Sequence, residues 1–132
     1  MSYRWTADQV ELLVVQAFRE FPEQGIWSPA KSVFKSVDGS PLPPGPIKVF
    51  VWSARYLGRE SPERIALLLW GRHKAIPREA LRDLVREMGW EWRTFLRRRN
   101  RACVRIAEGL RRDRIPYFDG EWHLVPALDH PP

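Results

Sequence analysis

Arginine side chains are concentrated in one stretch of the sequence, between residues 93 and 114. Nine arginines against Glu108 and Asp113 give this stretch a net charge of +7, whereas the whole chain of 132 residues carries +6, so all other residues together sum to −1. Arginine presents a planar fork of N–H donors that binds phosphate, or the O6 and N7 atoms of guanine, in a bidentate way. The stretch therefore indicates a polyanionic partner, most simply nucleic acid. The nine residues are Arg93, Arg97, Arg98, Arg99, Arg101, Arg105, Arg111, Arg112 and Arg114.

The arginine stretch forms the second half of a helix-turn-helix pattern over residues 77–112. Gly89 allows the positive backbone angle that a sharp turn between helices requires, Trp90 is expected to be buried beside it, and the second helix is predicted to begin near Glu91. In such a unit the first turns of the second helix contact base edges in the major groove, while flanking basic side chains hold phosphates. The apolar stripe of the first helix is Leu81, Leu84, Val85 and Met88, and that of the second is Phe95, Leu96, Ala102, Cys103, Ile106 and Leu110. The predicted base-contacting residues, with the first of them projecting from the helix, are Trp92, Arg93, Thr94, Arg97 and Arg98.

Two features of this region leave alternatives open. Arg98 stands three positions after Phe95, where many helix-turn-helix units have an apolar residue; either its alkyl stem packs while its charged head emerges, or the helix is rotated toward Leu96. A second basic group precedes the motif and is predicted to contact phosphates, with a solvated rim as the alternative. This group is Arg72, Lys74 and Arg78.

Catalytic and metal-binding patterns are weak in this sequence. His73, His123 and His130 have no ligand-like spacing with one another or with Cys103, and no nucleophile triad, phosphate loop or carboxylate pair stands out. We therefore expect a protein that is not an enzyme and needs no metal or cofactor. A single cysteine excludes an internal disulfide, and the longest apolar run, residues 65–70, is far shorter than the roughly 18 residues of a membrane span. The expectation is a cytoplasmic, nucleoid-associated protein with no membrane contact.

The elements that must position the arginine helix are predicted to form one helical domain over residues 1–132. A capping box at Thr6 and Gln9 begins an amphipathic helix over 6–21. Residues 22–46 hold half of the prolines and are predicted to be a loop, either packed on the core or extended toward a groove. A helical core with the motif follows over 47–114.

Within that core two helices are predicted ahead of the motif. The first covers 47–58, although its opening residues IKVFVW could also form a strand; its predicted apolar face is Ile47, Val51, Ala54 and Leu57. Ser61-Pro62-Glu63 begins the second, which is expected to run to about His73 at the centre of the core. After the motif, an Asp-Gly pair between aromatic runs predicts a β-hairpin over 115–125. The fold class is therefore all-α, with about five helices and a short C-terminal β-hairpin.

Residues 64–110 resemble a helix-turn-helix domain family of alphaproteobacteria and their prophages. The resemblance rests on Trp70-Gly71-Arg72 before the motif and on Ile106-Ala107-Glu108-Gly109-Leu110 at the end of the arginine helix. That family is similar to region 4 of sigma factors and to the DNA-binding part of gene transfer agent activators. The resemblance implies an activator of phage-like genes that binds double-stranded DNA and works with bacterial RNA polymerase and a further activator protein. It also implies that Arg101 and Arg105 lie nearer the DNA backbone than the base-contacting residues do.

Two other functions are compatible with the same charge pattern. A small terminase-like protein would recognise a packaging site on phage DNA, although no long heptad repeat for oligomerisation is present. An adaptor would use the arginine helix to bind an acidic protein surface. Discrimination between a specific and a scrambled duplex at fixed salt separates DNA recognition from the adaptor function.

Overall fold

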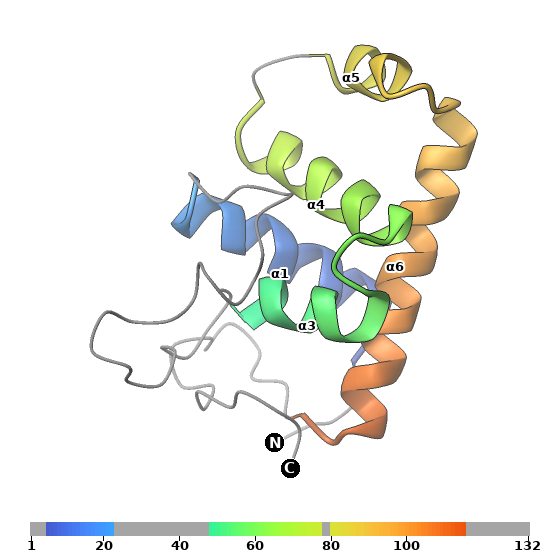
Figure 1. Cartoon of the computed structure of the whole chain (residues 1–132). Coiled ribbons are helices and arrows are strands. Elements are labelled where there is room, and N and C mark those ends of the chain that lie inside the picture. The colour runs from blue at the N-terminus through green and yellow to red at the C-terminus, as the bar shows by residue number, and fades with distance from the viewer. Residues whose placement is uncertain (1–4, 23–47, 78–79, 116–132) are drawn as a thin grey trace.

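The structure, a computed structural model, describes residues 5–22, 48–77 and 80–115, and this part of the chain is entirely helical. Its elements are α1 (Ala7–Glu20), α3 (Lys48–Leu57), α4 (Pro62–Ala75), α5 (Leu81–Glu87) and α6 (Trp92–Arg112) (Figure 1). These five helices confirm the predicted all-α class for the described residues. The proline-rich loop over 22–46 and the hairpin over 115–125 lie outside them, apart from Pro22 and Ile115, and no strand occurs among the residues that are described.

Helices α1 and α4 begin where the sequence predicted, and each is capped by a local hydrogen bond. The Thr6 side chain accepts a hydrogen bond from the Gln9 backbone at 3.3 Å, and the Gln9 side chain accepts one from the Thr6 backbone at 2.9 Å. Ser61 caps α4 by accepting from the Arg64 backbone at 3.1 Å, with Pro62 in the first turn. Each cap satisfies a backbone N–H that the helix itself leaves without a partner. α4 runs two residues past its predicted end, to Ala75.

Helix α6 contacts each of the helices α1, α3 and α4, which pack against one side of it (Figure 1). The predicted apolar line of α6 is buried as expected, from Phe95 through Ala102, Cys103 and Ile106 to Leu110. Leu67 and Leu68 of α4 belong to the same core. Because three helices cover this side, the arginines of α6 are left to the other side.

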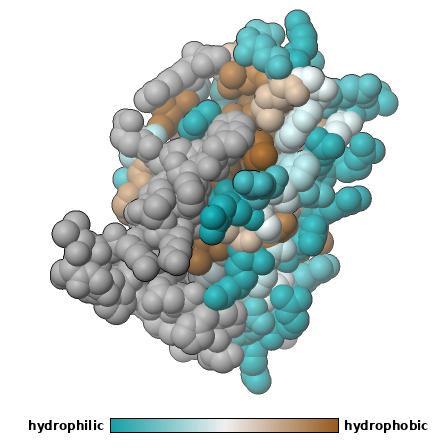
Figure 2. Space-filling view, in the orientation of Figure 1, coloured by the Kyte–Doolittle hydropathy of each residue, from teal (hydrophilic) through white to brown (hydrophobic). Residues whose placement is uncertain are grey.

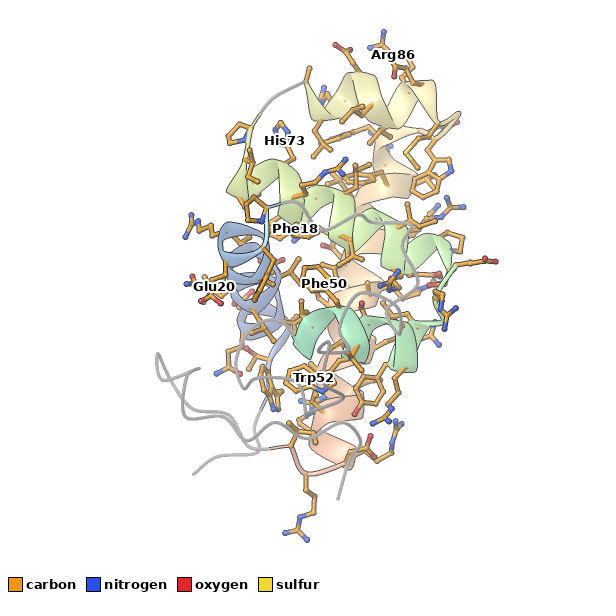
Figure 3. All side chains as sticks on the ribbon, turned by 60° about the vertical axis from the view of Figure 1, so that its left-hand side comes forward. Phe18, Glu20, Phe50, Trp52, His73 and Arg86 are labelled. Atoms are coloured by element: carbon orange, nitrogen blue, oxygen red, sulfur yellow. The ribbon has the colours of Figure 1, made fainter. Side chains whose placement is uncertain are left out.

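Helix α3 presents a different face to the core from the one predicted. Of the predicted face, Leu57 is buried, Val51 and Ala54 are half-buried, and Ile47 lies outside the described residues. Phe50 and Trp52, which were not predicted on that face, are buried. The reason is packing: Phe50 meets the ring of Phe18 on α1 in a T-shaped pair at 5.1 Å (Figure 3), and Trp52 meets Trp5 at 5.8 Å. Aromatic pairs of this geometry add to the area that they bury, so they set the rotation of a helix that is apolar on several sides.

Helix α5, a turn at Gly89 and helix α6 follow one another as predicted, but the first of the two helices is shorter than predicted. α5 begins at Leu81 rather than at Pro77, and its N-cap, Ala80, has no side chain that could accept a capping hydrogen bond. Gly89 has φ +80° as predicted, and the Trp90 backbone N–H donates to Val85 O at 3.1 Å to close the end of α5. Trp90 was expected to be buried, but it is half-buried.

Candidate nucleic-acid interface

The side of α6 that faces away from the core is long and strongly basic. Figure 2 shows hydrophilic side chains gathered along the edge of the molecule where α6 lies. Six exposed arginines and one exposed glutamate give this side a formal charge of +5. The helix has 21 residues, which corresponds to about 32 Å at the usual rise per residue. The exposed face of α6, as we call it, comprises Arg93, Arg97, Asn100, Arg101, Val104, Arg105, Glu108, Arg111 and Arg112.

One arginine of the same helix points inward instead. The side chain of Arg99 is only 16% exposed and forms an ion pair with Glu11 of α1. Its guanidinium also lies 4.5 Å from the ring centroid of Trp70 on α4. Arg99 therefore ties α6 to α1 and α4 and leaves the positive face to the other arginines.

A stack of three aromatic rings with a guanidinium at each end holds the turn between α5 and α6. The guanidinium of Arg82 lies 4.9 Å from the Trp92 ring, which is stacked on Phe95 at 5.3 Å. On the other side of the stack, Trp90 lies 6.5 Å from Phe95, and the Arg98 guanidinium lies 4.5 Å from the Trp90 ring. Contacts of this kind contribute about 0.5–2 kcal/mol each, depending on exposure. They fix the angle at which α6 leaves the turn.

This stack corrects one prediction and decides another. Trp92 was expected to project from the helix toward DNA, but it is half-buried because the Phe95 ring and the Arg82 guanidinium both lie against its ring. Arg98 is half-buried, and its guanidinium lies against the Trp90 ring. The structure therefore agrees with the alternative in which the side chain of Arg98 packs, and not with a helix rotated toward Leu96.

The other predicted contact residues differ in how free they are. Arg93 and Arg105 are exposed, and Thr94 is half-buried and accepts a hydrogen bond from the Arg97 guanidinium at 3.3 Å. Arg101 is exposed and lies 3.9 Å from a carboxylate oxygen of Glu63, which is at the outer limit of an ion pair. Exposed pairs of this kind contribute little, so Arg101 can turn to another anion at small cost.

The basic residues that were predicted to contact phosphates ahead of the motif do not belong to α6. Arg72 is half-buried and Lys74 is exposed, and both lie in the last turn of α4. Arg78 lies outside the described residues. The structure therefore does not add these residues to the exposed face of α6.

Three residues of the exposed face were missed in the sequence. Asn100, Val104 and Glu108 follow Arg97 at intervals of three, four and four, so continuing the helical period along α6 would have found them. Val104 is 46% exposed, which is unusual for a large apolar side chain in this molecule, where Leu12 is the other described example.

A buried arginine was also missed, and it braces the scaffold behind the face. Arg64 is 1% exposed, in a helix, α4, that was predicted to lie at the centre of the core. Its guanidinium donates to Ser53 Oγ at 3.0 Å, Arg59 O at 3.1 Å and Phe50 O at 3.3 Å. Burial lowers the pKa of this guanidinium to about 10, so it is still charged at neutral pH. The bonds link α4 to α3.

Cys103 has the environment of a core residue. It is buried against α1, and this burial, together with the negative charge of Glu11, raises the pKa of the thiol to about 12. A thiol in this state is a poor nucleophile and a poor metal ligand. Among the described residues, no group of three or more His, Cys, Asp or Glu side chains could hold a metal ion. None of the described helices has the length and apolar character needed to cross a membrane.

The exposed face of α6 thus combines a rigid helix, a net positive charge and a buried opposite side. Comparison of the chain with protein-family models, with curated proteins and with solved structures found no match.

Proposed function

We propose that this protein binds double-stranded DNA through the exposed face of α6. The observation that carries the proposal is the division of α6 into two sides, with six arginines exposed on one and residues such as Phe95 and Ile106 fully buried on the other. The major groove of B-DNA is about 12 Å wide and admits an α-helix. A helix held by its apolar side against three others can enter the groove without loss of its own packing.

The charge distribution indicates that this face binds a polyanion and is not simply a charged face exposed to solvent. Solvated helices usually interleave positive and negative side chains, whereas here Glu108 is the one acid among nine exposed residues of the face. Within the described part of the chain, Arg93, Arg105 and Arg111 form no ion pair. These cations are available to release counterions from a phosphate backbone, which is the main source of affinity for DNA.

Duplex DNA fits the face better than duplex RNA does. The major groove of A-form RNA is too deep and narrow for side chains on a helix to reach base edges.

The resemblance to gene transfer agent activators and sigma-factor region 4 supports a more specific role, in which the protein activates transcription of phage-like genes with bacterial RNA polymerase.

The proposal is tested by fluorescence anisotropy with the full chain. Duplexes are first selected from a random pool, and the selected duplex is compared with a scrambled one at the same salt concentration. Recognition of sequence predicts a difference of roughly 10³-fold or more. Arg105→Ala should reduce the slope of log K against log salt by about one. Arg19→Ala is the matched control, because Arg19 is an exposed arginine on α1, and it should leave the slope unchanged.

Two results would count against the proposal. If the chain binds no duplex but binds an acidic polypeptide such as polyglutamate, the face serves an acidic protein surface. If Arg19→Ala and Arg105→Ala change the salt slope equally, binding depends on net charge and not on α6.

A further inference from the structure

The exposed face of α6 contains three residues that are not arginine, and two of them, the valine and the glutamate, have no use on a surface that only holds phosphate. Asn100, Val104 and Glu108 are all exposed on it. A carboxylate such as that of Glu108 is repelled by phosphate, and a valine offers phosphate no hydrogen bond. Within the described residues, Glu108 forms no ion pair that would explain its presence.

Together with one arginine, these residues form a single ridge along the helix. Successive residues of an α-helix are turned by about 100°, so intervals of three, four and four keep the ridge within about 80° of arc. The ridge extends over the 11 residue-to-residue steps from 97 to 108, or about 16 Å, which corresponds to roughly five base pairs. We call it the central ridge; it comprises Arg97, Asn100, Val104 and Glu108. Arg101, Arg105 and Arg112 lie further round the helix, along one edge of it.

Each side chain of the central ridge matches a different base edge in the major groove. Arginine donates to guanine O6 and N7, and asparagine pairs with adenine N6 and N7. The methyl groups of valine suit the thymine methyl, and glutamate accepts from the cytosine N4 amino group. The departures from arginine on this face are therefore the residues that can distinguish sequences.

The position of the ridge in α6 also favours base contact. The groove winds around DNA while the helix is straight, so a long helix enters the groove deepest at its middle and diverges toward the backbone at its ends. The ridge is centred near Ala102, which is the middle residue of Trp92–Arg112. Arg93 and Arg111 are 18 residues apart, or about 27 Å, and would meet phosphates near the two ends.

Near the start of α6, in contrast, several side chains are engaged in packing within the protein. Trp92 is covered by Phe95 and Arg82, and the head of Arg98 lies against Trp90. Residues engaged in this packing cannot reach a base without breaking the stack that fixes the turn.

We infer that the base-contacting segment of this protein is the central ridge in the middle of α6, with the arginines at its ends and edge holding phosphates. The inference rests on the proposed function, and it moves base recognition from the first two turns of the helix, where the helix-turn-helix pattern places it, toward its centre.

The test is duplex selection from a random pool by the full chain and by single variants. Glu108→Gln should change a preferred cytosine to adenine at one position, because an amide pairs with adenine N6 and N7. Val104→Ala should relax a thymine position. In the duplex selected by the wild type, replacing that thymidine by deoxyuridine removes only the methyl group of the base. The affinity of the wild type for this duplex should then fall several-fold, and the affinity of Val104→Ala should not change. Leu12→Ala is the control and should select the wild-type site, whereas Arg93→Ala, in the first turn of α6, should select the same site with lower affinity. All four positions are exposed, and far-ultraviolet circular dichroism verifies the fold of each variant.

The outcomes separate this inference from the proposed function. If Val104→Ala and Glu108→Gln select the wild-type site unchanged, the central ridge does not contact bases. If Arg93→Ala selects a different site, the inference is also wrong, because bases are then contacted from the first turn of α6. If the wild type binds duplexes tightly and with steep salt dependence but selects no sequence, the inference fails while DNA binding stands. If the wild type binds no duplex, the proposed function itself is wrong.

Discussion

At Gly109, α6 lies close against the Tyr56 ring of α3, and replacement of this glycine by alanine tests the packing that turns the arginines outward. A Cβ atom at this position would lie 2.5, 2.6 and 2.8 Å from three ring atoms of Tyr56. Carbon atoms in ordinary contact are about 3.5–4.0 Å apart, so the ring would have to move by roughly 1 Å. Tyr56 is not free to do so, because its hydroxyl donates to Asp113 Oδ2 at 2.6 Å.

The magnitudes decide the sign of the effect. In a solvent-exposed helix, glycine to alanine stabilises by about 1 kcal/mol. Overpacking costs about 1–3 kcal/mol, and loss of a hydrogen bond to a charged group costs about 1.5–3 kcal/mol. Gly109→Ala should therefore lower the free energy of unfolding by about 1.5–5 kcal/mol. In a Tyr56→Ala background the ring is absent, and the same substitution should stabilise by up to about 1 kcal/mol.

The assay is urea denaturation followed by circular dichroism at 222 nm, with the four proteins of the double-mutant cycle measured together. The reasoning predicts a coupling of about 2 kcal/mol or more between positions 56 and 109. A Gly109→Ala variant as stable as the wild type, or equal effects in the two backgrounds, would refute the close contact between α3 and α6.

Two further substitutions test the turn and the buried cation. Gly89→Val should destabilise by about 1–2 kcal/mol through backbone strain alone, because φ is +80° and a Cβ there meets nothing within 4 Å; Gly89→Asn should lose less, and unchanged urea midpoints would show that the turn lies elsewhere. Arg64→Lys should destabilise by about 2 kcal/mol, because one ammonium cannot reproduce the bonds that the guanidinium makes to Ser53, Phe50 and Arg59; a lysine variant with wild-type stability would contradict this role for the planar fork.

Features with short-range causes could be predicted from the sequence. The caps at Thr6 and Ser61 each depend on a hydrogen bond across three residues, and Gly89 adopts a backbone angle that other residues resist. The buried line of α6 was predictable for a related reason: its apolar residues recur at the helical period between arginines, so one orientation of the helix satisfies both.

Where a helix is apolar on several sides, the sequence leaves its rotation open. Helix α3 could bury either the face with Val51 or the face with Phe50, and the ring of Phe18 on α1 selects the second. The same limit applies to Arg64, whose burial requires acceptors from α3 and the following loop that no local pattern can indicate.

The candidate site divides in the same way. The sequence alone determined that the positive charge belongs to one helix and that this helix follows a glycine turn, because charge and helical period are properties of consecutive residues. Only the tertiary structure decided which arginines face outward. Arg99 is drawn inward by Glu11 and Trp70, and Trp92 and Arg98 are engaged at the turn. These partners come from α1, α4, α5 and the turn itself, so the exposed face of α6 is defined by what the other helices leave uncovered.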